Sequence, residues 1–320
     1  MMEYFGVTIK ELREKRGFQI KEVYSGVVGR STAFRFERGT TSISTKKLLE
    51  VLYNIGIYSM DEFLFFHQKR INEPSKDLDK YLAQLMHKEG LNIKSKKHDQ
   101  VLGFYEEFKN SKKKEEKFLA YAAHFDYLTN QEENMGKNIP IAQILNEFQF
   151  EWGYIENYLL EIESWSFREL DWFPFLSSCF HKENRPLLLA RFKKNFKELR
   201  DYYENWERHY INNLINYLMN SVYMGYYDEL EKDISEIDKH FEMYSELQWG
   251  LSQRCRILYI KIIIAGKERR MDMIRKNYEQ LSKISNVLPK NNELMDFYLE
   301  DSLRKVKEIF PDLDVAKILK

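Results

Sequence analysis

The sequence predicts an all-α protein in which a small five-helix domain is followed by a long array of helix pairs. Three observations predict this fold. Apolar residues recur at helical spacing along most of the chain. Helix-breaking residues are few, with 6 Pro and 13 Gly in 320 residues. Aromatic residues reach 15%, which supplies large side chains for packed helices rather than for disorder.

The first domain, residues 1–68, contains signals for five short helices. They are expected at residues 7–16, 19–25, 30–38, 45–54 and 60–68. Glycines end the first, third and fourth of these helices, at Gly17, Gly39 and Gly56, as is typical of the position after a helix. Ser44 and Ser59 are suited to cap the fourth and fifth, and Glu62 completes a capping box with Ser59.

Residues 69–76 are polar, contain Pro74 and show little periodicity, so they are predicted to be a linker. The remainder, residues 77–320, is predicted to be a helical-repeat domain. Its expected helices cover residues 77–90, 98–110, 114–129, 140–149, 151–164, 184–206, 208–223, 226–243, 246–265, 268–286 and 292–308. The later pairs recur every 35 to 40 residues, roughly the tetratricopeptide period, which favours an α-solenoid with a free concave surface.

Composition excludes several classes of protein. The 50 basic and 50 acidic residues give no net charge, so any contact with nucleic acid must come from a local basic patch. Cys179 and Cys255 are expected to be reduced core thiols, because no cysteine or histidine spacing suits zinc. The longest apolar run, residues 257–265, is too short to span a membrane, and the N-terminus does not resemble a signal peptide. A cytoplasmic protein without membrane contact is expected.

The chain contains no P-loop, nucleophile elbow, HExxH or dinucleotide fingerprint. We therefore expect no enzymatic activity, no metal and no cofactor.

The segment at residues 29–39 has the pattern of a DNA-reading helix. Arg30, Ser31 and Arg35 fall on one stripe at the start of the third helix, where donors can reach base edges and phosphates. Thr32 is placed to contact a phosphate, and Arg38 is placed to contact the DNA that flanks the bases read by this helix. The alternative is a solvated basic helix, since arginine is common on helix surfaces.

Together with the five-helix layout and the RFERG segment, residues 7–66 resemble the lambda-repressor-like (XRE) helix-turn-helix family. The resemblance implies that Arg13 forms a fold-supporting ion pair with Glu37. It also implies that Gln19, at the start of the second helix, contacts a phosphate.

The resemblance narrows to the Rgg/GadR/MutR regulators of low-GC Gram-positive bacteria. RFERG is followed by SIS at residues 42–44, KLLEVL at 47–52 and MDEFL at 60–64, and EWGYIE at 151–156 is similar to a mid-chain family helix. We expect Trp152 and Tyr154 of that helix to pack in the core. The family implies a tetratricopeptide-like domain, a homodimer and, for several members, control by a short signalling peptide. Two helix-turn-helix units of a dimer would bind double-stranded promoter DNA at an imperfect palindrome.

The third helix departs from the family pattern. Gly29 stands where Ser or Thr is usual, Thr32 where Gln is frequent, and Ala33 and Phe34 where an aliphatic and a polar residue are expected. These departures favour an alternative function, in which the chain is a peptide-responsive adaptor that binds a partner protein without contacting DNA.

Asparagines on one expected helix indicate where a peptide could bind. Asn212, Asn216 and Asn220 are spaced i, i+4 and i+8, and their amides could hold the backbone of an extended peptide. Arg254 and Tyr223 could grip a carboxylate and an apolar side chain. Alternatively, these asparagines are ordinary surface residues.

Overall fold

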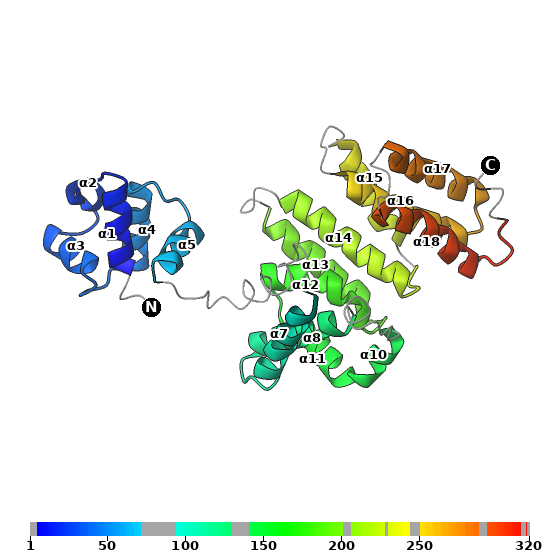
Figure 1. The fold of residues 1–320 in the computed structure, drawn as a ribbon, viewed down its shortest axis with the longest axis horizontal. Coiled ribbons are helices and arrows are strands. Elements are labelled where there is room, and N and C mark those ends of the chain that lie inside the picture. Colours follow the sequence, from blue (N-terminus) through cyan, green and yellow to red (C-terminus); the bar gives the residue numbers. More distant parts are fainter. Residues whose placement is uncertain are drawn as a thin grey trace. The chain divides into compact units, whose positions relative to one another are not determined.

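The structure is a computed structural model of the 320-residue chain. It describes residues 5–71, 94–129, 141–200, 206–227, 230–243, 250–287, 293–314 and 318. The chain divides into two compact units, Met1–Gln84 and Leu85–Lys320. Every regular element in the described ranges is a helix, and the predicted all-α fold is confirmed (Figure 1).

The N-terminal unit contains the five expected helices. They are α1 (Phe5–Lys15), α2 (Ile20–Tyr24), α3 (Arg30–Glu37), α4 (Thr45–Asn54) and α5 (Met60–Ile71). The start of the predicted linker, residues 69–71, belongs to α5. The rest of that linker and the helix expected at 77–90 lie outside the described residues.

A single apolar core holds these five helices together. Each contributes to it, for example through Ile9, Val23, Phe36, Leu52 and Phe63, which are at most 3% exposed. Burial of such side chains is the main stabilising contribution to a domain of this size.

The first and third helices of this unit approach closely at Gly6. A Cβ atom on Gly6 of α1 would lie 1.7 Å from the carbonyl oxygen of Phe36 in α3. No side chain fits there, so glycine is required by packing rather than by backbone conformation.

Capping residues fix the C-terminus of α3 and the start of α4. Gly39 has a φ of 74°, and the following Thr40 N–H donates to the Arg35 carbonyl at 2.9 Å, which closes the C-terminus of α3. Ser44 accepts from the Lys47 N–H at 3.5 Å at the start of α4. The tight turn between α3 and α4 therefore follows from local sequence.

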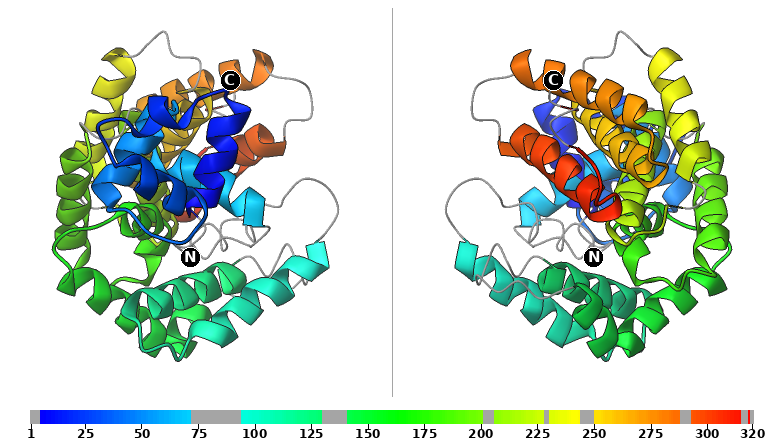
Figure 2. Two further views of the ribbon diagram at one scale, coloured as in Figure 1. Left: turned by 90° about the vertical axis from the view of Figure 1, so that its left-hand side faces the viewer. Right: turned by 90° about the vertical axis from the view of Figure 1, so that its right-hand side faces the viewer.

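The C-terminal unit is an array of antiparallel helices. Its elements are α7 (Lys94–Phe108), α8 (Lys114–Thr129), α10 (Ile141–Glu147), α11 (Gln149–Glu161), α12 (Phe167–Leu176), a 3₁₀ turn η2 (Ser177–Cys179), α13 (Arg185–Glu198), α14 (Trp206–Tyr223), α15 (Leu230–Met243), α16 (Leu251–Lys267), α17 (Met271–Val287) and α18 (Glu293–Ile309). Helices α7, α8 and α11 pack together, α12 packs on α14, and α14, α16 and α18 follow side by side. Figure 2 shows this succession from two sides. The predicted array of helix pairs is confirmed.

Helix α12 was not among the expected helices, which pass from residues 151–164 to residues 184–206. Pro174, two residues before the helix ends, removes one backbone hydrogen bond of the helix, and burial of the apolar face offsets this loss. At the other end, Glu169 accepts from the Ser166 N–H at 2.8 Å in a capping box. Fully buried Leu170 and Phe173 anchor the helix.

The expected burial of the Trp152 helix is confirmed for its tryptophan. Trp152 is 3% exposed, and its indole N–H donates to the Ile144 carbonyl at 3.2 Å. Tyr154 is half-buried beneath the Lys117 ammonium, 4.9 Å from its ring centroid.

Both cysteines are free thiols, but only one lies in the core. Cys255 is 1% exposed, and burial raises its pKa to about 11. Cys179 is half-buried at the end of η2, because only part of that turn is covered. In the described part of the chain, no helix is long and apolar enough to cross a membrane, and no three His, Cys, Asp or Glu side chains could jointly hold a metal ion.

Candidate nucleic-acid interface and peptide site

Helix α3 divides into a buried face and an exposed face. Ala33, Phe36 and Glu37 are at most 4% exposed. The exposed residues are Arg30, Ser31, Phe34, Arg35 and Arg38. At 100° per residue they cover an arc of roughly 140°, and Thr32 is half-buried at its edge. The helix therefore presents three arginines and a serine to solvent on one side.

The start of α3 is well suited to an anion. Gly29 at the N-cap has no side chain to occupy the first N–H groups, and the first turn contains no acidic residue. Unpaired N–H groups at a helix N-terminus attract phosphate. The Arg30 guanidinium lies 5.7 Å from the ring centroid of Phe34, which restrains its direction by a cation–π contact.

A buried ion pair connects α3 to α1. Arg13 donates from Nε to Glu37 Oε1 at 2.7 Å and from an Nη to Oε2 at 2.8 Å. It also donates to the Phe18 carbonyl at 2.9 Å. The hydrogen bond with Glu37 raises the pKa of Arg13, and burial raises the pKa of neighbouring Tyr24. This geometry is bidentate and leaves Arg13 no reach toward a ligand, so it holds the register of α3.

A shallow hollow separates α2 from α3. Its lining includes Gln19, Lys21, Arg30 and Phe34. The Gln19 backbone N–H donates to Glu22 at 2.6 Å, which places the exposed Gln19 side chain at the start of α2. Asn54 of α4 donates to the Val23 carbonyl at 2.8 Å and ties α2 to the domain. Gln19 and Arg30 thus border one hollow that carries polar and cationic groups.

Three further cations were not singled out from the sequence. Lys21 lies at the α2 side of the hollow, and Lys46 and Lys47 are exposed in the first turn of α4. The signal that could have identified them is their position at the starts of the helices that precede and follow α3, because in DNA-binding domains side chains at helix starts often contact phosphates.

The asparagines of α14 make contacts inside the C-terminal unit. Asn212 accepts from Gln253 at 2.7 Å, and Asn216 accepts from Arg256 at 2.5 Å. The Asn220 amide donates to the carbonyls of Pro174 and Phe175 at 2.6 and 3.3 Å. These amides tie α14 to α16 and to the end of α12.

Tyr223 and Arg254 lie at different places in the same unit. Tyr223 is 42% exposed at the end of α14, with the Lys305 ammonium 5.7 Å from its ring centroid. Arg254 lies 4.6 Å from the Phe241 ring centroid and donates to the Phe241 carbonyl at 3.0 Å. The structure thus brings the three asparagines onto one helix, with Tyr223 at its end and Arg254 against Phe241 of α15.

No family model matches the chain, and no curated protein matches it in sequence. Solved structures do match its fold over nearly the whole length. A Listeria monocytogenes EGD-e protein described as a candidate transcriptional regulator has a TM-score of 0.67 and 18% identity, covering 96% of this chain and 98% of that one. The pheromone receptor Rgg2 of Streptococcus dysgalactiae has a TM-score of 0.62 and 18% identity, covering 94% and 99%.

The third comparison is with a regulator solved together with its ligands. Bacillus thuringiensis PlcR, in complex with the peptide PapR7 and DNA, has a TM-score of 0.55 and 15% identity, covering 95% of this chain and 100% of that one. The fold expected from the resemblance is therefore confirmed, and the chain has the two-part helical fold of the Rgg- and PlcR-type regulators.

Proposed function

We propose that this protein is a sequence-specific, DNA-binding transcriptional regulator that acts as a homodimer in the cytoplasm and is controlled by a short peptide. The observation that carries the proposal is the exposed face of α3. It presents Arg30, Ser31 and Arg35 while the opposite face is fixed in the core. The protein is a binding protein in this proposal, without enzymatic activity or cofactor.

The physical reason is that α3 has the requirements of a reading helix. Arginine at the start of such a helix can donate two hydrogen bonds to guanine, and Ser31 or Thr32 can donate to a base or phosphate. Gln19 and Arg38 lie at the starts and ends of helices, where contacts with the DNA backbone position the domain. The ion pair between Arg13 and Glu37 supports the helix from below.

The structural relatives favour the same function. One of them is a pheromone receptor, and another was solved with a peptide and DNA bound. In a homodimer, two copies of α3 would read half-sites of an imperfect palindrome about 34 Å apart. A peptide would act by binding one dimer geometry more tightly than the other.

For the peptide, the proposed contacts are Asn212, Asn216, Asn220, Tyr223 and Arg254. The oxygens of Asn212 and Asn216 already accept hydrogen bonds, so their amide N–H groups are the donors left for a peptide backbone. At Asn220 a peptide would compete with two carbonyls of α12.

The proposal is tested by mobility shifts of the intergenic DNA beside the gene, over a range of salt concentrations. Arg35→Ala should weaken specific binding about fivefold or more, since a lost bidentate base contact costs roughly 1 to 3 kcal/mol. Lys15→Ala is the matched control, because Lys15 is an exposed cation of α1, with 76% of its side chain accessible. Equal affinity and equal salt slope for Arg35→Ala and the wild type would contradict the proposal.

The second candidate is the peptide-responsive adaptor that binds a protein partner. The observation that favours it is Phe34, which is 38% exposed in the middle of the proposed reading face. Phe34→Ala distinguishes the two functions. If the protein reads DNA, the Phe34→Ala variant should change in its affinity for promoter DNA. If the protein is an adaptor, the wild type should bind no promoter DNA, and the variant should no longer bind the protein partner.

A further inference from the structure

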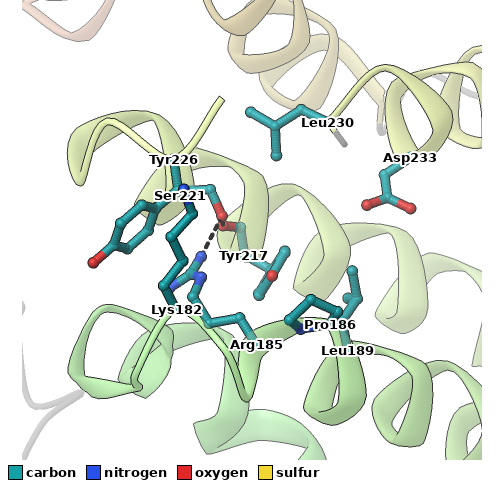
Figure 3. A pocket seen from close by; sticks show the side chains of 9 residues that line it. All are labelled: Lys182, Arg185, Pro186, Leu189, Tyr217, Ser221, Tyr226, Leu230 and Asp233. Atoms are coloured by element: carbon teal, nitrogen blue, oxygen red, sulfur yellow. Dashed lines mark hydrogen bonds between the residues drawn. The ribbon is translucent and has the colours of Figure 1, made fainter. Parts of the chain in front are cut away.

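A small pocket opens between α13, α14 and α15, far along the chain from the reading helix. Its volume is about 100 Å³, and Figure 3 shows the side chains around it. Arg185 from the start of α13 and Tyr217 and Ser221 from α14 form one end, and Tyr226 covers them. Leu189 and Leu230 supply apolar walls. The pocket therefore combines two cations, the buried Arg185 and the exposed Lys182, with aromatic and aliphatic surfaces.

Arg185 is the unusual member of this group, because it is only 4% exposed. One Nη donates to Ser221 Oγ at 2.6 Å, and the other donates to the Ser177 carbonyl. Its guanidinium carbon lies 5.0 Å from the Tyr217 ring centroid and 4.6 Å from that of Tyr226. A guanidinium has five N–H donors, so N–H groups beyond those that bond Ser221, the Ser177 carbonyl and the Tyr217 hydroxyl remain for a ligand.

The charge of Arg185 has no carboxylate partner among the described residues. The acidic side chain of this pocket, Asp233, lies toward its other end and is paired with Lys193 at 2.5 Å. Buried charges in proteins are normally paired, because removing an ion from water is costly. Neutral acceptors and two rings hold this arginine in place, and they leave its positive charge uncompensated.

We infer that this pocket binds a carboxylate that is attached to a short apolar group. The carboxylate would accept hydrogen bonds from the free N–H groups of Arg185 in the planar geometry that suits a guanidinium. The attached group would lie against Leu189 and Leu230. A volume of about 100 Å³ admits such a small end group, not a whole ligand. Such a group is either the C-terminus of a peptide or a free small carboxylate.

The test uses the full chain and two matched probes. N-acetyl-leucine carries a carboxylate and a short apolar side chain, whereas N-acetyl-leucinamide is the same molecule with the charge removed. Binding is followed by ligand-observed NMR and by the thermal midpoint in a titration. We expect saturable binding and a rise in midpoint with N-acetyl-leucine, and at least about tenfold weaker binding of the amide, because a charged hydrogen bond is worth about that factor.

Two variants and one control assign the binding to the pocket. Arg185→Gln should abolish binding of N-acetyl-leucine. Arg191→Gln should preserve it, because Arg191 of the same helix also binds carbonyls, those of Leu159, Leu160 and Ile162, but does not line the pocket. If Arg185→Gln does not fold, Leu189→Trp tests the same point by filling the pocket from a half-buried position.

Further probes identify the source of the carboxylate. Tighter binding of N-acetyl-leucine than of benzoate supports a peptide C-terminus, and tighter binding of benzoate supports a free small carboxylate. The inference is overturned if neither probe binds the wild type, if Arg185→Gln binds as well as Arg191→Gln, or if inorganic phosphate binds more tightly than both carboxylates. All of these measurements are made without DNA, so their failure is distinct from a failure of DNA binding by α3.

Discussion

Helices α3 and α14 carry similar polar patterns but use them differently. In α3 the polar stripe of Arg30, Ser31 and Arg35 faces solvent, because only the opposite face contacts the five-helix core. In α14 the asparagines at the same kind of spacing contact α16 and α12, because this helix is packed on several sides. A polar residue at helical spacing is thus fully available to a ligand where its helix has one packed face, whereas on a helix packed on several sides a ligand competes with tertiary contacts.

The largest expected effect concerns the ion pair that fixes α3. Glu37→Ala leaves Arg13 buried and uncompensated, so the free energy of unfolding of the N-terminal unit should fall by about 3 to 5 kcal/mol. Chemical denaturation combined with hydrogen exchange of residues 5–71 measures this loss. Glu14→Ala is the control, because Glu14 also contacts Arg13 but its side chain is 54% exposed, and its loss should cost less than about 1 kcal/mol. Equal losses from the two variants would contradict the supporting role of Glu37.

The second effect concerns the close contact between α1 and α3. Gly6→Ala places a methyl group against the Phe36 carbonyl and should destabilise the N-terminal unit by about 3 kcal/mol, the upper end for overpacking. Gly103→Ala in α7 is a control, since nothing lies within 4 Å of the added Cβ and the change should be neutral or slightly stabilising. If the hydrogen exchange of α3 were the same in the Gly6→Ala variant as in the wild type, α1 and α3 could move apart at little cost in free energy.

The third effect tests whether α14 uses its amides for structure. Asn220→Ala removes the donor to the Pro174 and Phe175 carbonyls and should destabilise the C-terminal unit by about 1 to 2 kcal/mol. Asn212→Ala removes one half-buried contact with Gln253 and should cost less. Thermal unfolding of the full chain measures both. A loss below about 0.5 kcal/mol for Asn220→Ala would indicate that this amide is free to bind a ligand instead.

The difference between α3 and α14 also explains how much of the fold and of the candidate sites could be predicted from the sequence. Apolar periodicity predicted most of the helices because they bury an apolar face, and it missed α12, a short helix with Pro174 near its end. Arg13 and Glu37 are 24 residues apart in the sequence. Their ion pair was predicted from the family resemblance, because the spacing of the two residues alone does not indicate a contact.

The pocket around Arg185 could not be predicted. Its lining residues run from Lys182 to Asp233 on three helices and the segments that connect them, and none of them belongs to a motif. Only the packing of α13, α14 and α15 brings Arg185 beside Tyr217 and Tyr226. The same limit applies to the asparagines of α14, because their partners on α12 and α16 are set by tertiary contacts.

The smallest effect concerns an exposed histidine that contacts a buried glutamate in the C-terminal unit. Because the histidine is exposed, we expect it to contribute little stability, like the surface residues of α3. The His181 side chain is 71% exposed, and its Nδ1 lies 2.5 Å from a carboxylate oxygen of Glu156. The hydrogen bond with Glu156 raises the pKa of His181 in the folded state. Its stabilisation is therefore fully present below the unfolded pKa of about 6.5 and disappears as the pH rises through the folded pKa.

Solvent screening limits this stabilisation to a few tenths of a kcal/mol. We expect the wild type to exceed His181→Asn in unfolding free energy by more at pH 5.5 than at pH 8.5. Denaturation of both proteins at the two pH values measures the difference. If the wild type exceeded His181→Asn by more at pH 8.5 than at pH 5.5, Glu156 would stabilise the neutral imidazole rather than the charged one. The contact would then resemble the structural hydrogen bonds of α14 rather than the exposed residues of α3.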